Sequence, residues 1–255
     1  MSGSSPKYMQ IAKSRLDWAR HRIDEFISDV DAFLAGKPYL IARKVKREGE
    51  MGRITFIMQI KKKAHRTLRF RAGDAIHNLR ATVDNLIYGL AQTRNSPHNF
   101  GLEFYETKEG FSKTYAAKIK CLPVEIRDWI MSEQVHNRSN GPSLLHILTK
   151  MWNADKHRAP ALIAGAIPSG HVGRKTKGFF IKEFRTSSLR GFEDGDPIAW
   201  GLLPINDVVH FQPDFTVDVS FGKKSAAGDK IVRTFLLDAH EHILKQVIPK
   251  FEPFL

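Results

Sequence analysis

The sequence predicts an α+β fold, with a helical bundle packed on a mostly antiparallel β-sheet and a closing C-terminal helix. Two observations lead to this class. Apolar residues recur at helical spacing through most of residues 1–158, and short apolar runs between Gly, Asp and Pro clusters fill residues 159–255. A β-hairpin is expected at residues 39–61, and its strands should join the later strands in one sheet. The chain has no internal repeat or low-complexity linker, so residues 1–255 are predicted to form a single intertwined domain.

The first helix is predicted to begin at Ser4-Ser5-Pro6, a cap followed by proline, and to end at Gly36. Strands are predicted at residues 39–47 and 53–61, where apolar and polar side chains alternate. The residues between them, 48–52, suit a hairpin loop.

A second long helix is predicted from Thr67 or Gly73 to Gln92. Shorter helices should follow at residues 111–120, at residues 124–132 and after Gly141-Pro142-Ser143. The β-rich half has four apolar runs, at residues 161–167, 178–184, 198–203 and 215–221. A last helix is predicted over residues 233–247, stopped by Pro249.

The composition indicates a folded, soluble protein. The chain has 255 residues, of which 42% are hydrophobic and 10% aromatic, which is enough apolar material to bury a core. No stretch approaches the roughly 18–20 apolar residues that cross a bilayer, and the first residues lack the apolar core of a signal peptide. Cys121 is the single cysteine, so no internal disulfide can form. We therefore expect a cytoplasmic protein with no membrane partner.

The basic charge is concentrated in one segment. Twelve basic residues lie between Lys37 and Arg71, opposed only by Glu48 and Glu50, so this segment holds most of the formal net charge of +13. A patch of one sign attracts polyanions such as RNA. It can equally be a solvated hairpin whose long side chains keep an edge strand soluble. The ten candidates for contact with phosphates are Arg43, Lys44, Lys46, Arg47, Arg53, Lys61, Lys62, Lys63, Arg66 and Arg69.

Two polar clusters need an explanation beyond a solvated surface. The first lies on the second helix, where Asp74, His77, Arg80 and Asp84 are predicted to face away from the apolar stripe, with Asn78 among them. His, Asn, Arg and Asp favour fixed hydrogen-bond geometry, whereas a solvent face is usually rich in Lys and Glu. The second cluster is Asp155, Lys156, His157 and Arg158.

Asp155 continues an apolar helix face toward the interior, because it lies four residues after Met151 and seven after Leu148. A carboxylate aimed inward needs a partner, and Arg80 or His77 is the candidate. In one interpretation such a pair is a structural lock between two helices; in the other the two clusters form a functional site.

The two motifs, G-D-x-x-H-N-L-R-x-x-x-D-x-L from Gly73 and D-K-H-R from Asp155, resemble those of a family of uncharacterised bacterial proteins. In that family a helical first half that carries both motifs precedes a β-rich second half. The family has no established activity that could be transferred.

A looser resemblance is to the HEPN class of helical domains, many of which are metal-independent endoribonucleases. Their Arg-then-His signature is matched by Arg71 and His77. The resemblance implies that His77 exchanges protons with the RNA 2′-hydroxyl or the leaving oxygen, while Arg71 stabilises the phosphorane charge. Arg80 and Asp84 complete the candidate catalytic set. HEPN proteins act in defence or stress responses and usually as dimers, so the resemblance also implies a homodimer.

Other chemistries lack their motifs. No zinc spacing, nucleotide-binding glycine loop or nucleophile elbow is present, so no cofactor or metal is expected. The leading hypothesis is an RNA-directed, nucleic-acid-associated protein. Two alternatives stay open: a non-catalytic structural or interaction protein, and a module that binds a small molecule in the polar cluster.

Overall fold

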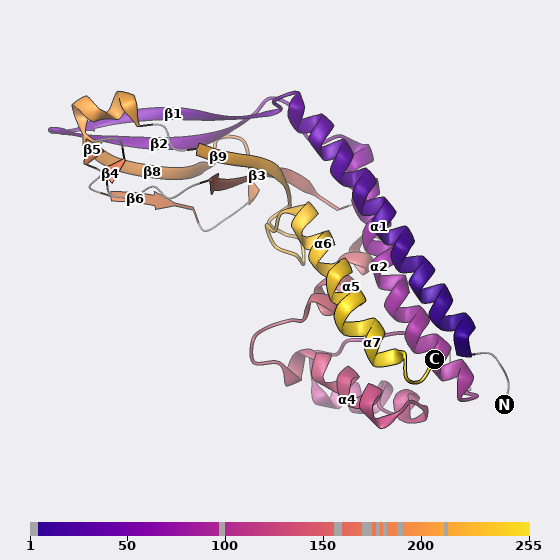
Figure 1. Cartoon of the computed structure of the whole chain (residues 1–255). Helices are drawn as coiled ribbons and strands as arrows, with labels where there is room; N and C mark the ends of the chain where they lie inside the picture. Colours follow the sequence, from indigo (N-terminus) through magenta and orange to yellow (C-terminus); the bar gives the residue numbers. More distant parts are fainter. Residues whose placement is uncertain are drawn as a thin grey trace. The chain divides into compact units, whose positions relative to one another are not determined.

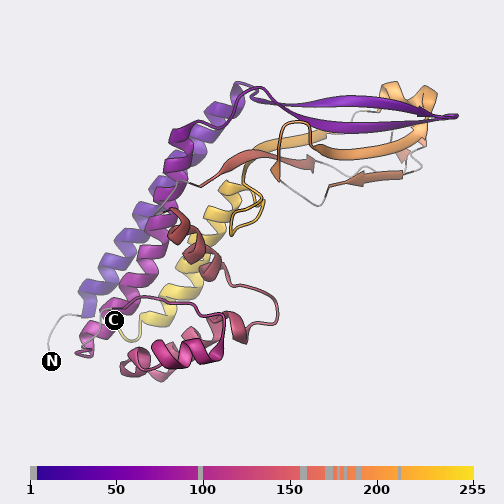
Figure 2. The same ribbon diagram turned by 180° about the vertical axis from the view of Figure 1, so that it is seen from behind.

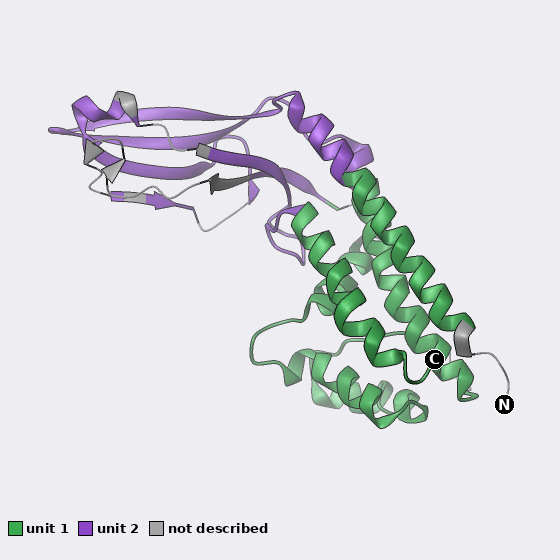
Figure 3. Ribbon diagram, viewed as in Figure 1, with its two compact units in different colours: residues 1–26, 70–160, 233–255 green, residues 27–69, 161–232 purple. Residues whose placement is uncertain are grey.

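The computed structural model describes residues 5–96, 100–155, 160–169, 175–176, 179–180, 183–187, 191–211 and 214–255. It confirms the α+β class, with helices, antiparallel sheets and a C-terminal helix (Figure 1). The chain forms two compact units, each assembled from separate segments (Figure 3). Unit 1 comprises residues 1–26, 70–160 and 233–255, and unit 2 comprises residues 27–69 and 161–232. The expected single domain stays a prediction.

Two long helices dominate unit 1. Helix α1 spans Ser5–Ala35 and α2 spans Arg66–Thr93, and they run side by side in both views (Figures 1 and 2). The apolar stripe predicted for α2 is buried throughout, with Leu79 and Val83 fully inaccessible. Asn95 follows α2 with φ of 52°, the left-handed conformation that commonly ends a helix.

The remaining helices of unit 1 are short. They are α3 (Lys108–Thr114), the 3₁₀ turn η1 (Lys118–Cys121), α4 (Val124–Glu133), the 3₁₀ turn η2 (Val135–Asn137) and α5 (Leu144–Asp155). Between α2 and α3 the chain is extended from Phe100 to Tyr105. None of the helices in the described part of the chain combines the length and apolar character needed to cross a membrane.

The C-terminal helix differs from the prediction. Helix α6 spans Val232–His242, and Pro249 does not stop it: a π-helical turn, η4 (Ile243–Val247), leads into α7 (Ile248–Phe251). Proline lacks the N–H that an α-helix interior requires, and its ring clashes with the preceding turn. The wider π turn places Pro249 at the start of α7, where proline is tolerated.

Unit 2 is built on a four-stranded antiparallel sheet. Strand β1 (Tyr39–Glu48) pairs with β2 (Met51–Ile60), β2 with β8 (Pro197–Pro204), and β8 with β6 (Glu183–Thr186). The predicted hairpin therefore joins two of the later strands, but the expectation that the later strands form one sheet with it was wrong, because the others belong to separate sheets. Its turn is Gly49-Glu50, and Gly49 has φ of 66°, which glycine adopts without strain.

The other strands of unit 2 form smaller sheets. Strands β7 (Gly191–Phe192), β3 (Leu162–Ser169) and β9 (Asp214–Phe221) make a three-stranded sheet, and β4 (Lys175–Thr176) pairs with β5 (Phe179–Phe180). The single strand predicted at residues 178–184 was wrong. Its two ends belong to different sheets, because β5 turns back on β4 while β6 pairs with β8.

One face of the four-stranded sheet carries the core of unit 2. Ile54 and Phe56 of β2 pack with Val208 of the 3₁₀ segment η3 (Ile205–His210) and with Phe211. Gly52 makes this contact possible: a Cβ atom there would lie 2.3 Å from Cγ2 of Val208. The opposite face of the sheet is described below.

Candidate functional site

The polar cluster predicted on α2 does not form one exposed face. Asp74 and His77 are exposed, but Asn78 and Arg80 are buried, with 6% and 4% of their surface accessible. Arg80 was predicted to lie opposite the apolar stripe, and its burial shows that α2 is covered on more sides than that stripe alone. Asp84 lies at the margin, with its side chain 27% accessible.

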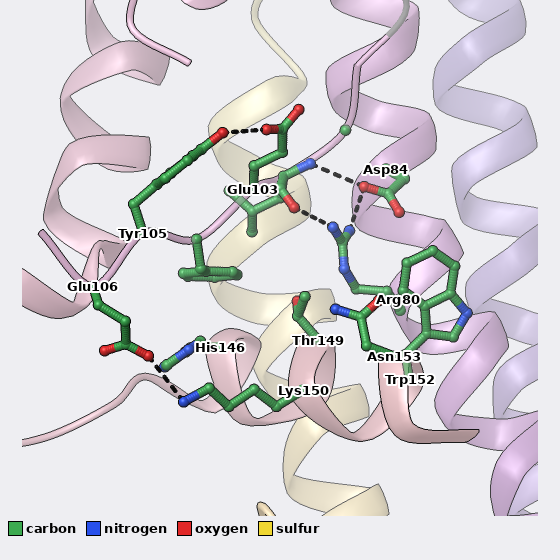
Figure 4. A pocket seen from close by; sticks show the side chains of 13 residues that line it. Arg80, Asp84, Glu103, Tyr105, Glu106, His146, Thr149, Lys150, Trp152 and Asn153 are labelled. Atoms are coloured by element: carbon green, nitrogen blue, oxygen red, sulfur yellow. Dashed lines mark hydrogen bonds and ion pairs between the residues drawn. The ribbon is translucent and has the colours of Figure 1, made fainter. Parts of the chain in front are cut away.

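Arg80 and Asp84 form an ion pair that holds the extended segment after α2 (Figure 4). Nη2 of Arg80 donates to the carbonyl oxygen of Leu102, and Oδ1 of Asp84 accepts from the Leu102 amide at 2.9 Å. The pair therefore satisfies both polar groups of one backbone residue. Gly101 is required beside it, since a Cβ atom there would lie 1.9 Å from Asp84 Oδ1.

Gln134, which no sequence pattern singled out, fixes the next part of this segment. Its Oε1 accepts from the Tyr105 amide at 2.9 Å, and its Nε2 donates to the Glu103 carbonyl at 3.0 Å. Tyr115 donates its hydroxyl to the Gly101 carbonyl at 2.6 Å, and its burial raises its pKa. Four side chains thus bond the backbone of residues 101–105, as a neighbouring strand would in a sheet: Arg80, Asp84, Tyr115 and Gln134.

His77 contacts α5 rather than the other members of its cluster. Its Nδ1 accepts a hydrogen bond of 2.9 Å from Nε1 of Trp152. The indole N–H can only donate, so a neutral His77 carries its proton on Nε2. The lone pair of His77 is therefore already engaged by Trp152.

Arg71 lies within electrostatic reach of a different helix. Its charge, together with the stronger effect of Arg22, lowers the pKa of Glu25 on α1. Six residues separate Arg71 from His77, which places the two side chains about 120° apart around α2. The structure therefore does not bring the HEPN-like Arg and His together.

Asn78 ties α2 to α1. Its Oδ1 accepts from Nη1 of Arg15 at 3.1 Å, and its Nδ2 donates to the Asp74 carbonyl at 2.8 Å. Nothing in these contacts is available to a ligand, so the role of Asn78 is to hold two helices.

The second predicted cluster cannot be placed. Asp155 is the last residue of α5, but its side chain lies outside the described part of the structure, as do Lys156, His157 and Arg158. The expected contact of Asp155 with Arg80 or His77 stays a prediction.

A pocket of about 510 Å³ lies in unit 1, between α5 and the segment that Arg80 and Asp84 hold (Figure 4). Helix α5 contributes residues at helical spacing, so one face of this helix forms a wall. The side chains that line the pocket are Arg80, Asp84, Leu102, Glu103, Phe104, Tyr105, Glu106, His146, Thr149, Lys150, Trp152 and Asn153.

The acidic side chains of the pocket all have basic partners. Lys150 pairs with Glu106 at 3.0 Å, and this pairing lowers the pKa of Glu106. Glu103 pairs with Lys118 at 3.0 Å and also accepts from the Tyr105 hydroxyl at 2.6 Å. Burial and the nearby Glu103 raise the pKa of Tyr105, so its hydroxyl stays protonated near neutral pH.

His146 is a buried member of the pocket wall that the sequence did not point to. It is 4% accessible, and its Nδ1 has no hydrogen-bond partner among the described residues. Burial, with a further effect of Lys150, lowers its pKa. His146 is therefore neutral near pH 7, with one ring nitrogen as donor and the other as acceptor.

No protein-family model, curated protein or solved structure matches this chain. Among the described residues, no group of three or more His, Cys, Asp or Glu side chains is placed to hold a metal ion.

The predicted phosphate-contacting residues all lie in unit 2, but in two groups. Arg43, Lys44, Lys46, Arg47 and Arg53 lie toward the hairpin turn. The others, Lys61, Lys62, Lys63, Arg66 and Arg69, follow the far end of β2. Arg53 and Lys61 are eight residues apart along an extended strand, which corresponds to roughly 26 Å.

The sheet face opposite the core combines cations with an aromatic ring, and we call it the cationic face. Trp200 of β8 lies at its centre, directly opposite Thr55 of β2 and Arg185 of β6. The guanidinium carbons of Arg53 and Arg185 lie 4.5 and 5.7 Å from the centre of the Trp200 ring. The exposed Lys44 and Lys46 of β1 belong to the same face, as the strand register shows.

Proposed function

We propose that this protein binds single-stranded RNA through the cationic face of unit 2. The observation that carries the proposal is Trp200, half-buried on an antiparallel sheet, with two guanidinium groups near its ring and two lysines on the same face of edge strand β1, beyond β2. Proteins that bind single strands combine stacking platforms with a charged track for the backbone.

The acidic residues on this face leave room for phosphate. Glu48 pairs with Arg53 at 2.8 Å and Glu183 with Arg185 at 2.6 Å. Both pairs are partly exposed to solvent, and ion pairs at the surface contribute little to stability. A phosphate group can therefore exchange with either carboxylate, since an Arg fork binds both geometries.

RNA cleavage by His77, Arg71, Arg80 and Asp84 has weaker support than RNA binding. Arg71 influences Glu25 of α1 through its charge, whereas the lone pair of His77 accepts a hydrogen bond from Trp152 of α5. Arg80 and Asp84 support the alternative of a structural lock, because both hold the Leu102 backbone. We therefore expect RNA binding without cleavage that depends on His77.

The proposal is tested by the salt dependence of binding to a labelled single-stranded RNA. Each lost phosphate contact reduces the slope of log K against log salt by about 0.7. We expect Lys44→Gln/Lys46→Gln, on the cationic face, to weaken binding and to reduce the slope by roughly 1.4.

The matched control is Arg43→Gln/Arg47→Gln, which removes the same charge from the same strand on its other face. It should leave the slope nearly unchanged, with thermal melting used to confirm that both variants fold. Equal losses in the two variants would reduce the proposal to a nonspecific effect of net charge. Binding that ignores salt would exclude phosphate contacts altogether.

A further inference from the structure

The pocket in unit 1 forms a second candidate site, independent of the cationic face. We infer that it binds an uncharged planar nitrogen heterocycle of nucleobase or nucleoside size. Its volume of about 510 Å³ lies within the range of small-molecule sites, roughly 300–1,000 Å³.

Flat rings dominate the walls of the pocket. Phe104 and His146 are in contact, with ring centres 5.0 Å apart and planes inclined by 35°. Trp152 is held in place from two sides, by the hydrogen bond to His77 and by the Arg80 guanidinium 5.6 Å from its ring centre. Fixed aromatic faces favour a planar ligand that can stack on them.

The charges of the pocket favour a ligand without net charge. The ion pairs Arg80–Asp84 and Lys150–Glu106, which Figure 4 shows, neutralise two acidic groups of the wall, and Lys118 neutralises Glu103. A charged ligand would have to break one of these pairs to gain a partner of its own. Arg80 is the least available of them, because it is buried and also bonded to the Leu102 carbonyl.

The neutral polar groups that are left for a ligand lie on one face of α5. His146, Thr149 and Asn153 are spaced i, i+3 and i+7 along this helix. Thr149 donates its hydroxyl to the Leu145 carbonyl at 2.8 Å, so its oxygen is left to accept. Asn153 is exposed and offers both a donor and an acceptor. Nucleobases carry alternating hydrogen-bond donors and acceptors on the edge of the ring, so they complement these three side chains.

Titration calorimetry with adenosine, guanosine, cytidine and uridine tests the inference on the full chain. We expect at least one nucleoside to bind, and Asn153→Ala to weaken it at least tenfold. Asn140→Ala is the matched control, because Asn140 is exposed but does not line the pocket. Thr149→Val, which keeps the side-chain shape, should also weaken binding. Asn153→Ala and Thr149→Val should both have melting temperatures close to that of the wild type.

Charged probes separate the alternatives. Spermidine and inorganic phosphate should bind no better to the wild type than to Asn153→Ala. Failure of all four nucleosides to bind at millimolar concentration would overturn the inference, as would equal losses in Asn153→Ala and Asn140→Ala. Binding of nucleosides should persist in Lys44→Gln/Lys46→Gln, so this inference and the proposed RNA binding can fail separately.

Discussion

Gly101 shows how a single residue determines the pocket wall. Its lack of a side chain allows the Asp84 carboxylate to reach the Leu102 amide, and the ion pair with Arg80 then closes around the segment. Gly101, Asp84 and Arg80 act as one unit, so a substitution at one of them disturbs the contacts of the other two.

Gly101→Ala should destabilise the protein by about 1–3 kcal/mol, the usual cost of overpacking. The added Cβ would lie 1.9 Å from Asp84 Oδ1 and must displace either the carboxylate or the backbone. Urea unfolding of Gly101→Ala and of Gly110→Ala measures the effect. A Cβ at Gly110 comes no closer than 3.3 Å to its neighbours, and Gly110 lies in α3, so this control should be neutral or slightly stabilising because alanine favours the helix. A Gly101→Ala protein as stable as the control would contradict the proposed role of the Asp84 contact.

Residue patterns in the sequence found one part of the site and missed the other. Arg80 and Asp84 are four residues apart on the predicted helix, a spacing at which opposite charges can pair, and in the structure they form an ion pair. Gln134 and His146 were missed because their partners are a backbone segment and a pocket wall about thirty or forty residues away in the chain. Only the folded chain brings them together, and local periodicity carries no signal for such contacts.

At the scale of elements, Ser143 sets the start of α5 and hence the position of the pocket wall. Its Oγ accepts from the His146 amide at 3.1 Å, as an N-cap does. Ser143→Ala should lower the free energy of unfolding by about 0.5–2 kcal/mol. Ser143→Asp, which can also accept this hydrogen bond, should keep most of the stability. Equal losses in the two variants, measured by urea unfolding, would show that capping is not the reason for Ser143.

Most elements could be predicted from the sequence, and the exceptions have physical causes. Helices α1 and α2 and the hairpin were predicted because their patterns are long and their ends carry Pro, Gly or Asn. Pro249 misled the prediction because a π turn, which leaves no sequence pattern, precedes it. Strands β5 and β6 were merged into one because apolar content does not indicate which strand each one pairs with.

At the scale of the whole molecule, the buried His146 and the half-buried His240 and His242 predict acid sensitivity. Burial lowers the pKa of His146, with a further effect of Lys150, and lowers those of His240 and His242 as well. Each pKa is therefore lower in the folded than in the unfolded state. As pH falls below about 6.5, the unfolded chain takes up these protons first, so the free energy of unfolding falls.

Urea unfolding at pH 7.5 and pH 5.5 measures this loss. Paired carboxylates such as Glu25 and Glu106, whose pKa values are lowered, lose their contribution only at more acidic pH. The loss of stability caused by the histidines can thus be separated from the loss caused by the carboxylates, because the two occur in different pH ranges. Stability that is constant or rises from pH 7.5 to pH 5.5 would contradict the assignment of neutral buried histidines.

The positions of the basic residues predict the RNA-binding surface better than the net charge of the molecule does. The ten predicted basic residues divide between the turn half of the hairpin and the segment after it, and within the first group only Lys44, Lys46 and Arg53 share a face with Trp200. This placement makes the cationic face, rather than the whole basic segment, the expected contact for RNA.

Cross-linking tests this placement most directly. Single-stranded RNA is cross-linked to the full chain by ultraviolet light, and the modified peptides are mapped by mass spectrometry. We expect nucleotides cross-linked to Trp200 of β8 and to the β1–β2 hairpin. In Trp200→Leu, the cross-link to β8 should be lost and RNA binding should be weaker. Cross-links confined to α2 around Arg71 and His77, with none on β8, would contradict it.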